Sequence, residues 1–370
     1  MLTNTKSSII LSHTPYFGNS RFSTAINNGI ELEEIIQFPD KHIKTLKLRK
    51  ETISFLKEEK YSQYLEKANR WINKPQNHIV TILDKNYPKN LRELPDAPFI
   101  IYCSGNLTLL DSPQLAIVGA RNYSTYGKNV TDKICHDLSK SKITVTSGLA
   151  YGIDTLAHKF ALDNNLNTIA VVGTGADIVY PSSNRDLYSR ILQNSGLIVS
   201  EFPLGTGPLR HNFPQRNRII SGLAKGVIVV EAAHKSGSLI TAQLALEQNK
   251  EVFAIPGSIF SKTSEGCNDL IKQGAKLVSN INDILEEINI DYHSNPSAIQ
   301  ENNKKSQIAH LSLQEQSILQ IVASNLTTLD KIIIESKLPY NQVTEILFEL
   351  EMKSLIESVP GGYINTQKFN

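Results

Sequence analysis

The sequence predicts an α/β protein with a doubly wound parallel sheet, and two observations support this. From Leu115 onward, short continuous runs rich in Val and Ile recur, and such runs are typical of strands buried on both faces of a sheet. Longer helical patterns separate them, and repeated βα units specify parallel strands with right-handed crossovers. A chain of 370 residues with 40% hydrophobic content can bury a sizeable core and divide into two or three domains.

Residues 1–75 precede the sheet and predict a small helical domain. Apolar residues and turn formers alternate irregularly there, as they do around Gly18, and this pattern is typical of short helices. Five Lys or Arg residues lie between Lys41 and Lys50 with no acid among them. Because charge runs are usually solvated, we expect a solvated helix face, with a phosphate-binding patch as the alternative.

The sheet is expected within residues 78–290. Two strands precede the regular alternation, and the remaining strands belong to it. The segments between them contain the Gly, Pro and Asn residues that mark turns and loops. The predicted strands are residues 78–83, 99–103, 115–118, 143–146, 168–172, 197–199, 227–230, 251–255 and 276–278.

Two further segments complete the chain. Residues 291–308 are polar and predict a linker. Residues 309–370 contain three short helical stretches and then a hairpin around Pro360, which is the order of a winged helix-turn-helix. The third helix carries apolar residues at helical spacing, namely Val343, Ile346, Leu347 and Leu350.

The outward positions of that third helix are acidic or neutral. They are Gln342, Glu345, Glu349 and Glu351. A helix with this charge is a poor candidate for the major groove, because DNA binding relies on cations that neutralise phosphates. We therefore expect this domain to serve protein contact or autoregulation.

Composition narrows the class of protein. Net charge is only +2, so any affinity for nucleic acid must come from local clusters of basic residues. Cys103, Cys135 and Cys267 are far apart in the sequence, which predicts buried thiols in a reduced cytosol and neither a disulfide framework nor a metal site. No run has the length of a signal peptide or a membrane span. We expect a cytoplasmic protein without a metal or cofactor.

The stretch 197–238 is the densest in chemical information. No acid lies between Glu201 and Glu231, and the basic residues there are Arg210, His211, Arg216, Arg218 and Lys225. Ligands of open α/β sheets bind at the carboxyl ends of strands, where basic side chains and helix N-termini attract anions. The stretch therefore predicts a polyanion site.

Helical phase separates the residues of this stretch. Pro214 is suited to the first position of a helix. From there, Arg216 shares a stripe with Ile219 and Ile220, whereas Arg218 points nearly opposite. Phe213 just before the helix has two open interpretations, a hydrophobic staple or a platform for a stacked base.

The turn after residues 115–118 lacks a dinucleotide-binding pattern. Gly119 permits a tight turn and Ser124 can cap the next helix. Position 121 is Arg, so G-x-G-x-x-G is absent, and no acid follows at the expected distance. An Arg beside a helix N-terminus suits phosphate instead of NAD or FAD.

The later turns carry weaker signals. Asp154 and His158 share a helical face, and without a third ligand we expect a structural pair. Gly148 and Gly152 would permit close backbone approach. Lys235 before a hydroxyl-rich helix start predicts an anion cradle, with N-capping by Ser238 as a compatible role.

Five motifs together resemble the DNA-processing protein A family (DprA, also called Smf). In chain order they are AIVGARNYSTYG, TSGLAYGIDTLAH, VVGTGADIVYPSSN, SEFPLGTGPLRHNFPQRNRIISGLAKGVIVVEA and KSGSLITAQLALEQ. The resemblance covers roughly residues 80–290. The N-terminal part is similar to the family's small helical domain in a degenerate helix-hairpin-helix form, and the C-terminal part matches a winged helix found in many members.

The resemblance implies an extended Rossmann-like domain that binds single-stranded DNA without known catalysis. It also implies protection of incoming DNA during natural transformation, loading of the RecA recombinase, and a homodimer formed through the Rossmann-like domain. By correspondence of motifs and by the charge pattern, the predicted binding residues are Gly119, Ala120, Arg121, Arg210, His211, Asn212, Phe213, Arg216, Arg218, Lys235, Ser236, Gly237 and Ser238.

Two other functions remain as alternatives. A nucleotide-binding hydrolase of the same architecture would need a carboxylate near the Lys235 turn, and Glu247 lies more than two helical turns beyond it. A transcriptional regulator would need a winged helix that binds a specific duplex, and the acidic third helix argues against this.

Overall fold

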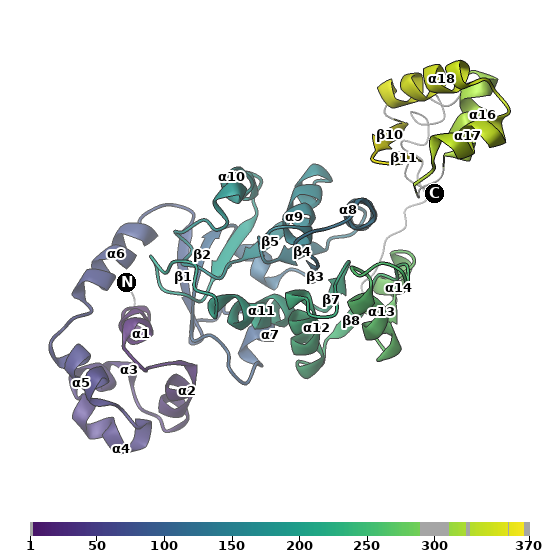
Figure 1. The fold of residues 1–370 in the computed structure, drawn as a ribbon. Helices are drawn as coiled ribbons and strands as arrows, with labels where there is room; N and C mark the ends of the chain where they lie inside the picture. The colour runs from purple at the N-terminus through teal and green to yellow at the C-terminus, as the bar shows by residue number, and fades with distance from the viewer. Residues whose placement is uncertain (1–2, 289–310, 323–325, 354, 366–370) are drawn as a thin grey trace. The chain divides into compact units, whose positions relative to one another are not determined.

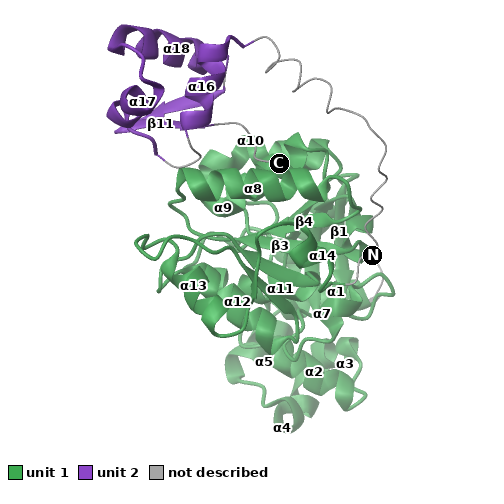
Figure 2. Cartoon of the chain, turned by 90° about the vertical axis from the view of Figure 1, so that its right-hand side faces the viewer, with its two compact units in different colours: residues 1–293 green, residues 294–370 purple. Residues whose placement is uncertain are grey.

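A computed structural model describes residues 3–288, 311–322, 326–353 and 355–365 (Figure 1). The chain forms two compact units, unit 1 with residues 1–293 and unit 2 with residues 294–370 (Figure 2). The predicted linker, residues 291–308, lies outside the described residues. The domain boundary near residue 75 stays a prediction.

Unit 1 is built on a nine-stranded sheet with the order β1-β2-β6-β5-β4-β3-β7-β8-β9. Each predicted strand is present, with ends that differ by one or two residues. The bounds are β1 (Asn77–Thr81), β2 (Ile100–Gly105), β3 (Gln114–Val118), β4 (Thr144–Ser147), β5 (Thr168–Val171), β6 (Leu197–Ser200), β7 (Gly226–Val229), β8 (Glu251–Ala254) and β9 (Lys276–Leu277).

The predicted parallel arrangement is confirmed for β3 to β9. Adjacent strands of that set pair in parallel, for example Ile117 opposite Ile228. The exception is β2, which is antiparallel to both of its neighbours, β1 and β6. The sheet is therefore mixed, with β2 running opposite to the other strands.

Helices cover both faces of the sheet (Figure 1). On β3, Leu115 and Ile117 pack toward α8 and α9, whereas Ala116 and Val118 pack toward α11 and α12. Helix α10 covers the first face beside β5 and β6. The helices are α7 (Lys89–Arg92), α8 (Thr125–Leu138), α9 (Ile153–Asp163), α10 (Arg185–Gln193), α11 (Asn212–Leu223), α12 (Gly237–Glu247), α13 (Glu265–Lys272) and α14 (Asn282–Leu285), with 3-10 turns η2 (Leu107–Asp111) and η3 (Ser182–Asn184).

The N-terminal helices pack directly on β1 and β2. Phe22 stacks on Phe99 with ring centroids 4.4 Å apart, and Trp71 meets the edge of Tyr102 at 6.1 Å. These rings belong to one apolar cluster that joins the helices to the sheet. The helices are α1 (Thr3–His13), α2 (Asn19–Asn27), α3 (Leu32–Gln37), α4 (Ile43–Leu46), α5 (Lys50–Lys57) and α6 (Ser62–Ile72), with the 3-10 turn η1 (Pro39–His42).

The basic run near residue 45 lies on this helical part. Lys41 pairs with Glu34 at 3.8 Å, and His42 lies 3.6 Å from the same carboxylate. Lys44, Lys47 and Lys50 are exposed. The solvated face that we expect from the sequence fits this arrangement.

Unit 2 has the predicted winged-helix order. The elements are α16 (Leu313–Ile321), α17 (Leu329–Ser336), α18 (Tyr340–Met352), β10 (Ile356–Val359) and β11 (Gly362–Asn365). Strands β10 and β11 form the antiparallel hairpin, and a capping box between Ser312 and Glu315 begins α16. The predicted apolar stripe of α18 is buried, and Glu345, Glu349 and Glu351 are exposed.

Two compositional predictions have structural counterparts. The three cysteines are buried, as predicted. No described helix combines the length and apolar character that crossing a membrane requires.

Candidate nucleic-acid interface

A pocket of about 940 Å³ lies at the carboxyl edge of the sheet. The turns that follow β3, β4, β5 and β7 meet there with the first turns of α11 and α12. Strands β4 and β7 lie on opposite sides of β3 in the sheet. The chain therefore continues from β3 to β4 on one side, and later adds β7 on the other side. Open α/β sheets bind ligands at such a switch point.

The turn after β3 is packed backbone to backbone against the start of α9. Gly152 has a φ of +85°, and a Cβ added to it would lie 2.2 Å from the carbonyl oxygen of Ala120. The amide of Ile153 donates to that oxygen at 3.1 Å. The prediction of close backbone approach at Gly152 is confirmed, and the contact fixes the exposed Arg121 at the pocket wall.

A buried carboxylate from β7 supports the same turn. Glu231 accepts hydrogen bonds from the backbone amide of Ser124 at 2.9 Å and from its hydroxyl at 2.6 Å. Ser124 in turn accepts from the amide of Gly127 at 3.2 Å, so the predicted cap of α8 is confirmed. Sequence reasoning missed this role of Glu231, and the available signal was an acid directly after a buried strand.

The pocket floor holds a buried guanidinium and a buried carboxylate around Gly148. A Cβ added there would lie 2.0 Å from Nη1 of Arg216 and 2.6 Å from Oδ2 of Asp154. Asp154 accepts from the amides of Gly148 at 3.1 Å and Ala150 at 3.4 Å, and Arg216 donates to the carbonyl of Val171. The close approach predicted for Gly148 is confirmed.

Burial shifts the pKa values of both floor groups. It raises the pKa of Asp154, while the charge of Arg216 and the two amides oppose that rise. Burial lowers the pKa of Arg216 to about 10, and Asp154 opposes this change. Arg216 therefore stays cationic at neutral pH while it lines the pocket.

Asp154 and His158 both have structural contacts, but with other residues than the predicted pair, and the partner of His158 is Thr168. The hydroxyl of Thr168 donates to the carbonyl of Val145 at 2.8 Å, so it accepts from Nδ1 of His158 at 2.7 Å. Burial, together with the charge of Arg216, lowers the pKa of His158 to about 3. His158 is therefore neutral at physiological pH.

The basic loop (residues 201–211) and the start of α11 form another wall of the pocket. Helix α11 begins at Asn212, so the prediction that Pro214 opens it is wrong by two residues. Pro214 is tolerated in the first turn of the helix, because backbone amides there have no intrahelical acceptor and proline has no amide hydrogen to donate. Phe213 lies inside the helix, which excludes the staple interpretation because a staple needs a residue before the N-cap.

Phe213 forms part of an aromatic pair at the pocket. Its ring centroid lies 5.5 Å from that of Tyr180, with the planes tilted by 42°. A Cβ added to Gly173 would lie 2.9 Å from Phe213 Cδ1, so the turn after β5 needs glycine to hold the ring. Arg210 is exposed at the same wall.

The start of α12 carries the residues from which an anion cradle is predicted, and the structure corrects one detail of that prediction. Its N-cap is Ser236, whose hydroxyl accepts from the amide of Ser238, so the prediction of capping by Ser238 is wrong. The two hydroxyls lie 2.7 Å apart, and Lys235 beside them is exposed. Cations and a helix N-terminus here favour an anion.

The structure brings together most of the predicted binding residues. Those that line the pocket are Gly119, Ala120, Arg121, Arg210, Phe213, Arg216, Lys235, Ser236, Gly237 and Ser238. His211 is exposed but lies outside the lining. Asn212 is buried, and its amide group donates to the carbonyl of Gly173 at 3.1 Å, which anchors the helix start.

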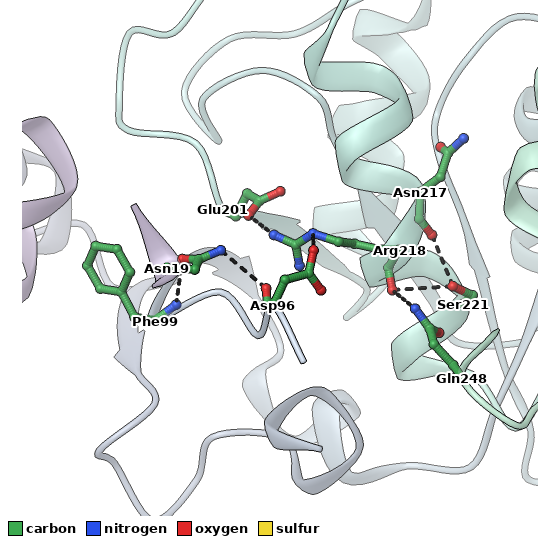
Figure 3. A network of polar contacts seen from close by, with 8 residues as sticks. All are labelled: Asn19, Asp96, Phe99, Glu201, Asn217, Arg218, Ser221 and Gln248. Atoms are coloured by element: carbon green, nitrogen blue, oxygen red, sulfur yellow. Dashed lines mark hydrogen bonds and ion pairs between the residues drawn. The ribbon is translucent and has the colours of Figure 1, made fainter. Parts of the chain in front are cut away.

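Arg218 lies outside the pocket lining, and the structure gives it a different environment. Its guanidinium pairs with Glu201, and its Nε lies 2.9 Å from Oδ2 of Asp96 (Figure 3). Burial raises the pKa of Glu201 to about 7, although Arg218 opposes the shift. The physical reason for the different placement is helical phase, because Arg218 points away from the stripe that carries Arg216.

Further lining residues were not predicted. The same turns and helices supply Asn122, Tyr151, Tyr180, Asn217 and Thr241, and the segment between β8 and α13 supplies Thr263. The signal for Tyr151 and Tyr180 was an aromatic in a strand-to-helix turn. Within the described residues, no group of three or more His, Cys, Asp or Glu side chains is placed to hold a metal.

Comparison with known proteins gives a consistent match. Residues 78–289 match the model of the family described as DNA recombination-mediator protein A, and residues 302–362 match the DprA winged helix domain. Protein Smf of Escherichia coli is 41% identical over 304 residues, which cover 82% of this chain and 81% of that protein. The DNA processing protein DprA of Streptococcus pneumoniae is 49% identical over 207 residues, covering 56% and 73% of the two chains.

Two solved structures are also similar. The X-ray structure of DNA processing protein A from Streptococcus pneumoniae matches with a TM-score of 0.66 and 37% identity, covering 79% of this chain and 99% of that one. The protein from Helicobacter pylori, whose structure describes a single-stranded DNA binding mode, matches with a TM-score of 0.53 and 34% identity, covering 59% and 98%.

The low pKa of His158 gives a pH dependence of stability. The unfolded chain binds a proton at His158 below about pH 6.5, whereas the folded chain does so only near the lowered value. The free energy of unfolding is therefore unaffected by the titration of His158 above pH 6.5. It decreases as the pH falls from 6.5 toward 3, by up to about 1.4 kcal/mol per pH unit.

His158→Asn keeps a donor for Thr168 and removes the titrating ring. We expect it to be less stable than the wild type at pH 7 but to lose less stability between pH 6.5 and pH 4.5. Urea unfolding at several pH values measures both quantities. If the stability of the variant has the same pH dependence as that of the wild type, the loss of stability below pH 6.5 does not come from His158.

Proposed function

The chain belongs to the family of DNA recombination-mediator protein A, and we propose that it binds single-stranded DNA in the pocket at the carboxyl edge of the sheet. The observation that carries this proposal is the composition of the pocket wall, where exposed Arg121, Arg210 and Lys235 line the same pocket as the Tyr180–Phe213 ring pair. A nucleic-acid strand offers phosphates to such cations and bases to such rings.

The polar framework of the pocket favours holding a strand over reacting with it. Asp154 already accepts two backbone amides, and His158 lies below the floor as a neutral, fully buried group. A general base must reach the proton that it abstracts. Apart from the buried Asp154, the charged residues in the described pocket lining are Arg121, Arg210, Arg216 and Lys235, and such cations suit a phosphate backbone.

Relatives support the same assignment and its finer form. The Helicobacter pylori protein binds single-stranded DNA, and the family is described as a recombination mediator. We extend the proposal to protection of incoming strands in natural transformation, loading of the RecA recombinase, and a homodimer formed through unit 1. This finer role rests on family membership and not on the geometry of the pocket.

A nucleotide hydrolase is the competing function for a pocket of this architecture. Glu247 ends α12, and ten residues of helix separate it from the helix start by about 15 Å. Incubation of the full chain with nucleoside monophosphates and with single-stranded DNA decides between the two functions. We expect binding without release of base or phosphate, and turnover of either substrate would favour the hydrolase.

Loss of a phosphate contact should reduce both affinity and its salt dependence. We expect Arg121→Ala and Arg210→Ala each to weaken binding of single-stranded DNA and to reduce the slope of log K against log salt by about 0.7. The control is Arg190→Ala, which removes a partly exposed arginine that pairs with Asp163 outside the pocket. Fluorescence anisotropy across a salt series measures the slopes, and equal slopes in all proteins would remove these arginines from the site.

Base stacking on Phe213 should be measurable separately from charge. Phe213→Ala should weaken binding by about 1–3 kcal/mol, the range for a base stacked on an aromatic ring, without changing the salt slope. Phe213→Tyr keeps the ring and should bind nearly as the wild type does. If the alanine and tyrosine variants bind equally well, no base stacks on this ring.

The winged helix should contribute little to DNA affinity. Unit 1 is compact by itself, and the exposed face of α18 carries Glu345 and Glu349, which repel phosphates. A chain that ends at Asn302 should keep most of its affinity for single-stranded DNA at moderate salt. Loss of most of that affinity in gel shifts would show that unit 2 takes part in binding.

A further inference from the structure

We infer that the N-terminal helices position the basic loop, and so contribute to strand binding through residues outside the pocket. The inference rests on the proposed function of the pocket and extends it to Asn19 and Lys67. Two polar bridges and one apolar contact connect these helices to the loop.

The first bridge begins in α2 and ends at the start of the basic loop (Figure 3). The side chain of Asn19 donates to the backbone carbonyl of Asp96 at 3.2 Å and accepts from the amide of Phe99 at 3.4 Å. The carboxylate of Asp96 lies 2.9 Å from Nε of Arg218, whose Nη2 donates to Glu201. The bridge therefore joins α2 to the first residue of the loop and to α11.

The last part of this bridge is a buried ion pair, which is costly to break. The side chains of Arg218 and Glu201 are each 6% exposed. Removing one partner of a buried pair leaves an uncompensated charge. Because Glu201 precedes Arg210 and Arg218 follows Phe213, the pair joins the two ends of the segment that carries both proposed contact residues.

The second bridge begins in α6. Nζ of Lys67 lies 3.1 Å from Oδ2 of Asp177, and the other oxygen of that carboxylate accepts from the amide of Gly205 at 2.7 Å. Gly205 has a φ of +87°, and a Cβ added there would lie 2.2 Å from Nζ of Lys67. The positive φ favours glycine at this position, and the lysine ammonium lies close to its backbone.

The apolar contact lies between the two bridges. Leu204 of the loop and Ala176, which follows β5, are buried in the same apolar cluster as Ala68 and Trp71 of α6. The amide of Gly175 also donates to the carbonyl of Thr206 at 2.9 Å. The first half of the basic loop is therefore held from the side of the N-terminal helices.

The second half of the loop is exposed and carries Arg210. A side chain that must be ordered on binding weakens binding by its lost conformational freedom. Anchors at Glu201, Leu204 and Gly205 reduce that loss, since they fix the direction in which the chain approaches Arg210 and Phe213. The N-terminal helices would then act on affinity through preorganisation of the loop.

The test uses the full chain with Asn19→Ala, Lys67→Ala and the double variant. Lys57→Ala is the matched control, because Lys57 also pairs with an aspartate of the N-terminal helices, Asp40, but does not reach the loop. Lys67→Arg keeps the charge and the reach toward Asp177. Hydrogen exchange of residues 201–213 reports loop order without DNA, and anisotropy reports affinity for single-stranded DNA.

We expect the amides of residues 201–213 to exchange faster in the double variant than in the wild type, with unchanged exchange in α9. We expect its affinity for single-stranded DNA to fall by roughly fivefold or more. Lys57→Ala should change neither the exchange nor the affinity, and Lys67→Arg should behave like the wild type in both. The inference is overturned by unchanged exchange in the loop, by faster exchange with unchanged affinity, or by an equal loss in Lys57→Ala. If the wild type binds no single-stranded DNA, the proposed function fails, while the exchange result still decides whether the helices hold the loop.

Discussion

The contact between Gly152 and Ala120 is the constraint on which the pocket depends. It sets the start of α9 directly against the turn after β3, with no room for a side chain between them. Glu231 then fixes the other side of the same turn through Ser124. Arg121 therefore projects from a backbone held on two sides, and its direction is determined before any ligand arrives.

Helix α11 shows how two arginines close in sequence acquire different roles. Arg216 lines the pocket floor among Gly148 and Asp154, where burial lowers its pKa but leaves it cationic. Arg218 points away from that floor and pairs with Glu201 and Asp96. One arginine lines the pocket, and the other connects the loop to the rest of unit 1.

The two bridges also change how the N-terminal helices are understood. The resemblance seen in the sequence implies a small helical domain, and a phosphate-binding patch was the alternative interpretation of its basic run. In the structure, however, part of that basic run pairs with Glu34, while Asn19 and Lys67 reach contacts that end at the basic loop. Their principal connection to the pocket is therefore mechanical, through the loop.

The sequence by itself determined the fold class, the positions of the strands and the pocket as a whole. Val- and Ile-rich runs mark strands because both faces of the sheet are buried, and parallel strands bring their turns to one edge regardless of detail. That is why Gly119, Arg121, Phe213 and Lys235 could be grouped from the sequence. Local pattern also identified Ser124 as a cap.

Only the tertiary structure decided what each charged side chain contacts. The antiparallel direction of β2, the burial of Arg218 and the support from Glu231 all depend on partners far away in the sequence, such as Asp96 and Ser124. Charge and spacing along the chain show that a residue can bind an anion. Whether it does so, or instead pairs within the protein, depends on which distant carboxylate the fold places beside it.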